Sequence, residues 1–275
     1  MSAFTAACVQ MVSQADLEAN LDAAKRLIAE AHAKGAALVC LPENAFYMRD
    51  SSEGGAAAAF EEAEHPGVKM CVEEAAKKGA HILIGSIAVP AEGGRAYNRS
   101  VLIGPQGVIG TYNKIHLFDV TLPNGETYRE SERIAPGDAG VVATLPWGKI
   151  GMSVCYDLRF PQLYRALAKA GADFLAIPAA FTHTTGKAHW HILLRARAIE
   201  TGAFVFAPAQ GGVHNGRRRT YGHAMIVSPW GEILAEAPEE GEAVICAKVD
   251  VTKVAEARAQ IPALIHELET YAVTK

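Results

Sequence analysis

Residues 149–161 read KIGMSVCYDLRFP and carry the clearest structural signal in the chain. The apolar run that ends at Cys155 predicts a short buried strand. Pro161 suits the first turn of a helix through residues 162–169, because its fixed φ angle matches that position. The stretch therefore predicts a strand, a bend at Cys155 and a helix, an arrangement typical of α/β folds.

The position of Cys155 at this bend allows two interpretations. Orphan N–H groups at the start of a helix favour a thiolate and can hold an oxyanion, which suits a nucleophile. A cysteine at the end of a buried strand is otherwise a small core residue. The bend alone leaves both interpretations open.

Two other stretches place a charged side chain at the end of an apolar strand. Residues 37–44, ALVCLPEN, end near Glu43, and residues 110–119, GTYNKIHLFD, carry Lys114 just past a hairpin strand. Functional groups in α/β folds gather at the carboxyl ends of strands. We therefore expect Glu43, Lys114 and Cys155 to converge on one site.

Helix and strand patterns alternate along the chain. The expected strands span residues 4–11, 36–42, 81–89, 99–104, 108–112, 141–145, 149–154, 173–178, 203–208, 225–228, 232–235 and 243–249. The expected helices span residues 16–34, 66–78, 162–169 and 187–201, with loops at 53–60 and 114–140 and a mostly helical C-terminal segment. No linker or change of composition divides the chain, so we interpret residues 1–275 as a single α/β domain.

The composition narrows the classes of function. The formal net charge of −4 gives no general attraction to nucleic acid or to anionic membranes. The five cysteines are odd in number and form no CxxC pair, which favours a reducing cytoplasm over a disulfide framework. No apolar segment approaches the ~18 residues of a membrane span, and the N-terminus lacks a charged signal-like region. We expect a cytoplasmic protein with neither nucleic-acid nor membrane partners.

Three segments, LPEN (41–44), YNKIHLFD (112–119) and VCYDLRFP (154–161), resemble the signature segments of the nitrilase (carbon–nitrogen hydrolase) superfamily in sequence, order and spacing. The segments GKAHWHILLRARAIE (186–200) and RRRTYGHAMIVSPWG (217–231) resemble the branch that contains deaminated glutathione amidase. The resemblance covers nearly the whole chain. It implies a four-layer αββα sandwich and a hydrolase that acts on carbon–nitrogen bonds other than peptide bonds without a cofactor.

The resemblance also implies a role for each converging side chain. Cys155 attacks the amide, and Glu43 takes the thiol proton, protonates the leaving group and activates the water that cleaves the thioester. Lys114 and the backbone N–H of Tyr156 stabilise the oxyanion. Because Glu43 must both accept and donate a proton, we expect a mostly buried site to raise its pKa. Each residue taken singly has an alternative interpretation: Cys155 as a core residue, Glu43 as a helix cap and Lys114 as a solvated lysine.

A second glutamate is expected after the lysine. Within YRESE (128–132), Glu130 matches the position at which the family places a further catalytic glutamate, which would orient Lys114 and contact the substrate amide. Glu132 is the competing residue. Because the surrounding sequence is polar, a solvated loop glutamate is the alternative.

Two short segments are candidates for substrate binding. Phe181 and Thr182 follow a strand that is expected to end at the rim of the site. The basic run of Arg217, Arg218 and Arg219 can meet a substrate carboxylate through bidentate hydrogen bonds. The alternative for this run is a solvated basic loop.

Four other charged residues have structural interpretations. We expect Asp157 and Arg159 to form an ion pair that steadies the bend, with direct contact to the substrate as the alternative. We expect Arg195 and Arg197, on the helix at 187–201, to bind buried carboxylates.

Three histidines, His183, His189 and His191, raise the question of a metal site. His189 and His191 are two residues apart at an expected helix start, so their side chains point in different directions. We therefore expect no metal site, and the resemblance implies metal-free hydrolysis.

Three functions remain open. The first is an amidase that acts on deaminated glutathione and releases 2-oxoglutarate and cysteinylglycine through a thioester acyl-enzyme. The second is an ω-amidase, carbamoylase or nitrilase that acts on another small molecule. The third is a non-catalytic binding protein, against which the intact Glu43, Lys114 and Cys155 argue.

The resemblance further implies a homodimer or a higher homo-oligomer. Apolar residues available for a subunit interface lie in the helix at 162–169 and near the C-terminus. They are Leu163, Leu167, Ile261, Leu264, Ile265 and Leu268.

Overall fold

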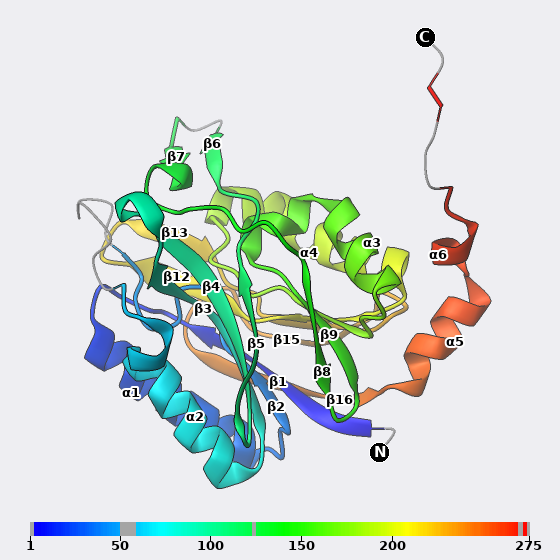
Figure 1. The fold of residues 1–275 in the computed structure, drawn as a ribbon, viewed down its shortest axis with the longest axis horizontal. Coiled ribbons are helices and arrows are strands. Elements are labelled where there is room, and N and C mark those ends of the chain that lie inside the picture. The colour runs from blue at the N-terminus through cyan, green and yellow to red at the C-terminus, as the bar shows by residue number, and fades with distance from the viewer. Residues whose placement is uncertain (1–2, 50–58, 123–124, 269–271, 274–275) are drawn as a thin grey trace.

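Two β-sheets lie face to face and helices cover their outer faces (Figure 1), in a computed structural model that describes residues 3–49, 59–122, 125–268 and 272–273. Helices α1 (Leu17–Ala33) and α2 (Pro66–Lys78) pack on the larger sheet, and α3 (Pro161–Lys169) and α4 (His183–Thr201) pack on the second sheet. The expected αββα sandwich is confirmed.

The larger sheet has the strand order β13-β12-β1-β2-β3-β4-β5, and β16 also pairs with β1. Its central strands β12, β1, β2 and β3 run parallel. The strands are β1 (Ala3–Met11), β2 (Leu38–Cys40), β3 (His81–Pro90), β4 (Ala96–Gly104), β5 (Gly107–Asn113), β12 (Ala209–His214), β13 (Arg218–Tyr221) and β16 (Ala243–Asp250).

The second sheet has the order β15-β14-β11-β10-β9-β8, with β9, β10 and β11 parallel. Its strands are β8 (Val141–Leu145), β9 (Gly148–Met152), β10 (Phe174–Ala176), β11 (Phe204–Ala207), β14 (Met225–Val227) and β15 (Ile233–Glu236). A short ribbon of β6 (Asp119–Thr121) and β7 (Thr127–Arg129) projects from the sandwich (Figure 1). Helices α5 (Thr252–Gln260) and α6 (Ala263–His266) end the described fold.

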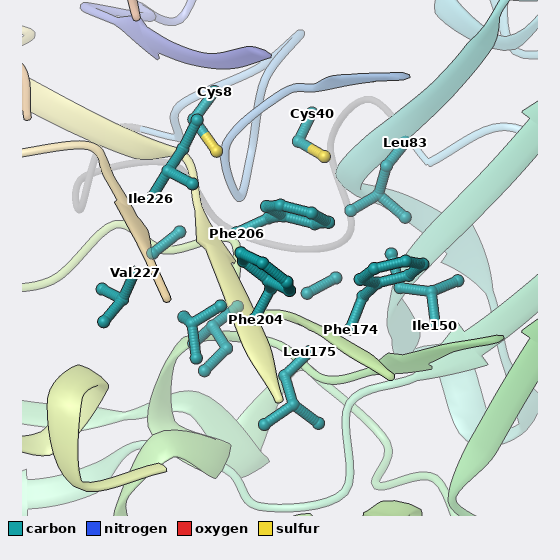
Figure 2. Close-up of a cluster of buried hydrophobic side chains, with 14 of the residues drawn as sticks. Cys8, Cys40, Leu83, Ile150, Phe174, Leu175, Phe204, Phe206, Ile226 and Val227 are labelled. Carbon is teal, nitrogen blue, oxygen red and sulfur yellow. The ribbon is translucent and has the colours of Figure 1, made fainter. Parts of the chain in front are cut away.

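The core between the sheets combines aromatic rings, aliphatic side chains and thiols. Phe174, Phe204 and Phe206 of the second sheet lie near Cys8 and Cys40 of the larger sheet (Figure 2). Burial of each such ring stabilises the fold by about 1.5–3 kcal/mol. Both cysteines are buried free thiols, so this interface is held by packing and not by a disulfide.

The structure departs from the expected elements in three places. Strands β12 and β13 were not expected, because Gly211 and Gly212 interrupt the apolar pattern of β12; a Cβ at Gly211 would lie 2.6 Å from the Gln10 amide nitrogen. Helix α4 begins at His183, earlier than residue 187. The loop at 114–140 contains β6 and β7. Most of the loop expected at 53–60 lies outside the described residues.

Within the part of the chain that the structure describes, no helix has the length and apolar character needed to span a membrane.

Candidate active site

Four polar side chains meet beyond the ends of strands from both sheets. Glu43 lies three residues after β2, Lys114 directly after β5 and Cys155 three residues after β9. Glu130 begins a 3-10 turn, Glu130–Glu132, after β7. The sandwich thus brings together residues that lie far apart in the sequence, as the strand ends predicted.

Cys155 lies at a strained bend. Its backbone has φ 51°, which is uncommon for a residue with a side chain, and its N–H donates to the carbonyl of Pro178 at 2.9 Å. A 3-10 turn, Cys155–Arg159, separates it from α3. Pro161 opens α3 as predicted, but the thiol does not lie at the N-terminus of that helix as we expected.

A buried carboxylate holds the bend. Asp157 accepts hydrogen bonds from the backbone N–H of Val154 at 2.8 Å and from the Tyr112 hydroxyl at 2.7 Å. Its other oxygen accepts from the backbone N–H of His116 at 3.0 Å. Because these donors come from β5, from the segment after it and from the bend itself, Asp157 ties the Cys155 turn to the Lys114 strand.

Lys114 is almost completely buried between two carboxylates. Its Nζ lies 3.0 Å from Glu43 Oε1 and 2.9 Å from Glu130 Oε2, and only 2% of its side chain is exposed. Burial alone would lower the pKa of this amine, but the charges of Glu130 and Glu43 raise it well above its usual value. Lys114 is therefore a fixed positive charge.

Glu43 is held at both oxygens. Oε2 accepts from the backbone N–H of Ala180 at 2.8 Å, and Oε1 accepts from Asn98 Nδ2 at 2.9 Å and from Lys114. Burial would raise its pKa, but the Lys114 charge and the hydrogen bonds from Cys155 and Lys114 lower it. The expected rise in the pKa of Glu43 is wrong, because burial was judged without the lysine.

The thiol shows the opposite shift. Burial and the neighbouring Glu43 charge raise the pKa of Cys155 well above its usual value, although the Lys114 charge opposes them. The expectation of a favoured thiolate is therefore wrong for the free enzyme. The raised pKa of Cys155 and the lowered pKa of Glu43 both favour a protonated thiol beside an ionised carboxylate.

The geometry favours Glu130 over Glu132 as the second glutamate of the site. Glu130 accepts from Lys114 and, at 2.6 Å, from the backbone N–H of Phe118. Glu132 is exposed and does not line the cavity described next.

These groups line the floor of a cavity of about 730 Å³. Its walls are rich in cationic side chains, which are Arg49, Arg129, Arg133, Arg159, Arg217, Arg218 and Arg219. A concave site with a nucleophile at its base and guanidinium groups on its walls suits a small anionic substrate.

Known proteins resemble this chain in sequence and in fold. The sequence profile of the carbon–nitrogen hydrolase family matches residues 5–259. The chain belongs to the carbon–nitrogen hydrolase family. The predicted resemblance to the nitrilase superfamily is confirmed, and the protein is a hydrolase of carbon–nitrogen bonds.

Individual relatives of this carbon–nitrogen hydrolase cover its whole length. A deaminated glutathione amidase from Synechocystis is 44% identical over 98% of this chain and 99% of its own. The omega-amidase NIT2 of Xenopus tropicalis is 38% identical over 95% of this chain and 94% of its own. The crystal structure of a CN-hydrolase superfamily protein from Xanthomonas campestris matches with a TM-score of 0.84 and 29% identity over 100% of both chains.

The predicted substrate-binding residues of this carbon–nitrogen hydrolase all line the cavity, but the three arginines differ. Arg219 pairs with Glu239 at 2.7 Å and Glu240 at 2.8 Å, so its charge is matched. Arg217 is exposed. Arg218 donates to the carbonyl of Ala180 at 3.2 Å, and its buried Nε has no partner among the described residues.

Tyr156, Phe181 and Thr182 form the wall next to the thiol. The guanidinium of Arg159 lies 5.8 Å from the ring centroid of Tyr156 and 5.0 Å from that of Phe181. Thr182 is buried and bonds Thr185 at 2.8 Å. No hydrogen bond of the Tyr156 N–H occurs within the described residues.

The structural assignments need correction. Arg159 is not paired with Asp157; its Nη1 lies 3.1 Å from His189 Nδ1, and it faces the cavity because Asp157 is already bound by the donors described above. Arg195 and Arg197 do not bind buried carboxylates. Arg195 donates to the carbonyl of Gly231, and Arg197 donates to the carbonyl of Leu158 and to the half-buried Glu200, because the ends of nearby loops present backbone acceptors there.

The histidines of α4 diverge as predicted. His183 bonds Glu239 at 2.9 Å, His189 faces Arg159, and His191 bonds Glu236 on the far side of the helix.

Two residues of the site were missed. Asn98 bridges Glu43 and Glu130 through one amide nitrogen, at 2.9 and 3.3 Å. Asn98 precedes the strand expected at 99–104 and stands beside other polar residues, so the sequence did not single it out. Arg159 was misassigned because an acid stood two residues before it.

Proposed function

We propose that this hydrolase is an amidase of small dicarboxylic substrates, with deaminated glutathione as the substrate, and that Cys155, Glu43, Lys114 and Glu130 carry the reaction. The observation that carries the proposal is the hydrogen-bonded thiol and carboxylate beside a buried lysine, at the floor of an arginine-rich cavity. The hydrolysis adds water across the amide and releases 2-oxoglutarate and cysteinylglycine.

Cys155 is the nucleophile and Glu43 is the general base. The thiol proton moves to Glu43 as the sulfur attacks the amide carbon, and Glu43 then delivers it to the departing amine. Glu43 next takes a proton from the water that cleaves the thioester, so one carboxylate serves all three transfers. The lowered pKa of Glu43 keeps it ionised and ready to accept the proton.

Lys114 and the backbone N–H of Tyr156 stabilise the tetrahedral oxyanion. The buried ammonium contacts Glu43, and it lines the same cavity as the thiol. Fixed charges in a water-poor site are among the largest contributions to catalysis. Hydrogen bonds with Glu130 and Asn98 fix the positions of Lys114 and Glu43.

The substrate carboxylates are bound by Arg218 and Arg159. The amide is surrounded by Tyr156, Phe181 and Thr182. Two guanidinium groups without a carboxylate partner in the described residues leave positive charge available in the cavity. The Synechocystis relative bears the name of an enzyme whose substrate carries two such carboxylates. Charge balance thus favours a dianionic substrate.

A second candidate is ω-amidase activity on a shorter substrate. The 38% identity to an omega-amidase supports it. A shorter substrate would leave one of the two arginines unused.

A substrate panel separates these activities. Purified protein is incubated with deaminated glutathione, with a small ω-amide of an oxo acid and with a neutral amide, while cysteinylglycine and ammonia are measured. We expect kcat/KM to be highest for deaminated glutathione. Preference for the short ω-amide would establish the second candidate, and the absence of turnover on every amide would refute both.

We also propose that residues 1–275 act as one carbon–nitrogen hydrolase domain, in the cytoplasm, as a homodimer or higher homo-oligomer. Extensive packing between the two sheets supports the single domain. The five free thiols support the compartment, and exposed apolar residues of α6 support the assembly.

A further inference from the structure

Two imidazoles and one carboxylate meet outside the cavity, where α4 faces the hairpin of β14 and β15. His191 Nε2 lies 2.9 Å from Glu236 Oε1, and His223 Nδ1 lies 2.6 Å from the same oxygen. One ligand atom from each of the three residues lies within 4.8 Å of the others. None of the three lines the cavity of Cys155.

We propose that His191, His223 and Glu236 form a binding site for a divalent transition metal ion, with Zn²⁺ as its best match. Two imidazoles and one carboxylate are a common ligand set for zinc, completed by water. The site goes beyond the amidase activity and shares no residue with it.

The ligand spacing is close to what a tetrahedral ion requires. With metal–ligand bonds of about 2.0–2.1 Å, neighbouring ligand atoms lie roughly 3.3 Å apart. The two nitrogen–oxygen distances, 2.9 and 2.6 Å, must therefore lengthen by less than about 1 Å when the ion replaces the shared protons. The side chains are 31%, 20% and 32% exposed for His191, His223 and Glu236, which leaves access for the ion and its water.

The scaffold around the three ligands is organised before any ion binds. His223 adopts φ 53°, and its carbonyl accepts from the indole nitrogen of Trp190 at 2.9 Å. Its ring packs on Tyr221, with centroids 4.5 Å apart. Among the described residues, no lysine or arginine pairs with Glu236, so its charge is available to a cation.

The spacing of the histidines in the sequence did not reveal this site. His189 and His191 diverge, as expected for positions two apart, but the partners of His191 come from the loop after β13 and from β15. The expectation that no metal site exists considered only the helix. A bound ion would fasten α4 to the edge hairpin of the second sheet.

Titration calorimetry with ZnCl₂ and NiCl₂ tests the proposal on tag-free protein. The Cys155→Ala background removes the active-site thiol as a competing ligand. We expect one ion per chain and a rise in the unfolding temperature that grows with metal concentration. His191→Ala, His223→Asn and Glu236→Gln should each weaken binding by roughly 10-fold or more, whereas His266→Ala, an exposed histidine elsewhere, should not.

Asparagine is chosen at position 223 because it tolerates positive φ. If that variant fails to fold, His191→Ala and Glu236→Gln still decide the outcome. Failure of Zn²⁺ and Ni²⁺ to bind, or binding that is equal in the parent and all three ligand variants, would overturn the site. Neither result depends on amidase activity, so the proposed function is tested separately.

Discussion

At Cys155, the backbone bend and the surrounding charges have different effects on the thiol. The bend at φ 51° directs the sulfur toward the cavity, whereas burial and Glu43 keep its proton in place. In the proposed mechanism, Cys155 becomes nucleophilic only when substrate arrives, through proton transfer to Glu43 and stabilisation of the oxyanion by Lys114. A free cysteine in water reacts by first ionising, a step that this mechanism does not require.

Cys155→Ala should abolish hydrolysis while the fold persists. The loss in kcat should be on the order of 10³-fold or more, because the variant lacks the sulfur that forms the thioester. Turnover is measured on protein whose circular dichroism matches the parent, with Cys246→Ala as the control, since that thiol lies on β16 away from the cavity. Substantial turnover by the folded variant would remove Cys155 from the mechanism.

Lys114→Ala should impair both turnover and stability. Its loss leaves Glu43 and Glu130 as buried carboxylates without a counter-charge, so the free energy of unfolding should fall by about 3–5 kcal/mol. Urea denaturation and steady-state kinetics measure the two effects. Lys187→Ala, an exposed lysine on α4, should change neither. A near-normal kcat for Lys114→Ala would contradict the oxyanion role.

Arg218→Ala should weaken use of the dicarboxylic substrate more than that of a neutral amide. Removal of the partner of a bound carboxylate costs about 2 kcal/mol or more, which is roughly 30-fold in kcat/KM. Arg219→Ala is the matched control, because Glu239 and Glu240 already neutralise that residue. If both variants behave alike on both substrates, Arg218 does not recognise a carboxylate.

The sequence predicted Glu43, Lys114 and Cys155 because each follows an apolar strand, and strand ends share one edge of a sheet. It could not predict the pKa shifts. Those depend on distances between residues 71 positions apart, such as the Lys114–Glu43 pair. Asn98 was missed for the same reason, since its importance lies in the two carboxylates that it joins.

Among the elements, those with strong apolar periodicity were predicted well. Helix α2 spans Pro66–Lys78, as expected from its opening proline and the following Gly79. Strands β12 and β13 were missed because their glycines and arginines lack that periodicity; partners in the sheet make them strands. Local pattern therefore fails where tertiary pairing supplies the stabilisation.

His214 connects these missed strands to the rest of the larger sheet. One ring nitrogen donates to the carbonyl of Ser13 at 2.7 Å, and the other accepts from the Thr220 hydroxyl at 2.7 Å. Burial lowers its pKa from 6.5 to about 4. His65, which caps α2, is lowered by burial to about 4 as well.

Stability should therefore decline as the pH falls from 6.5 toward 4. The unfolded chain binds protons at these histidines below pH 6.5, whereas the folded protein resists them until about 4. Each histidine should reduce the free energy of unfolding by about 1–2 kcal/mol between pH 7 and 5. Urea denaturation at both values measures this. His214→Asn should show a smaller pH dependence than the parent, and an unchanged dependence would contradict the assignment.

At the scale of the whole molecule, the C-terminal segment presents apolar side chains to solvent. Ile261 is 56%, Ile265 82% and Leu268 61% exposed. Of the other residues expected at a subunit interface, Leu163 and Leu264 are partly buried, and Leu167 is buried against Gly151 within the subunit. The exposed apolar surface that is available for self-association therefore lies around α6 more than on α3.

The protein should be a dimer or larger at micromolar concentration, and Ile265→Asp should shift it toward the monomer. A buried charge at a subunit interface is costly unless it is paired. Light scattering measures the mass of both forms. Val108→Asp, which changes an exposed apolar residue of β5, is the control. A monomeric parent would remove the basis for the assembly.

The charges of the cavity also bear on the release of the product. Around Lys114, two carboxylates leave the floor with one net negative charge while the thiol is protonated. The substrate arrives there with an uncharged amide carbonyl, and hydrolysis turns that group into a carboxylate beside Glu43. Like charges repel across such a short, water-poor distance. We therefore expect the charge that the product has just acquired to speed its release from the floor of the cavity.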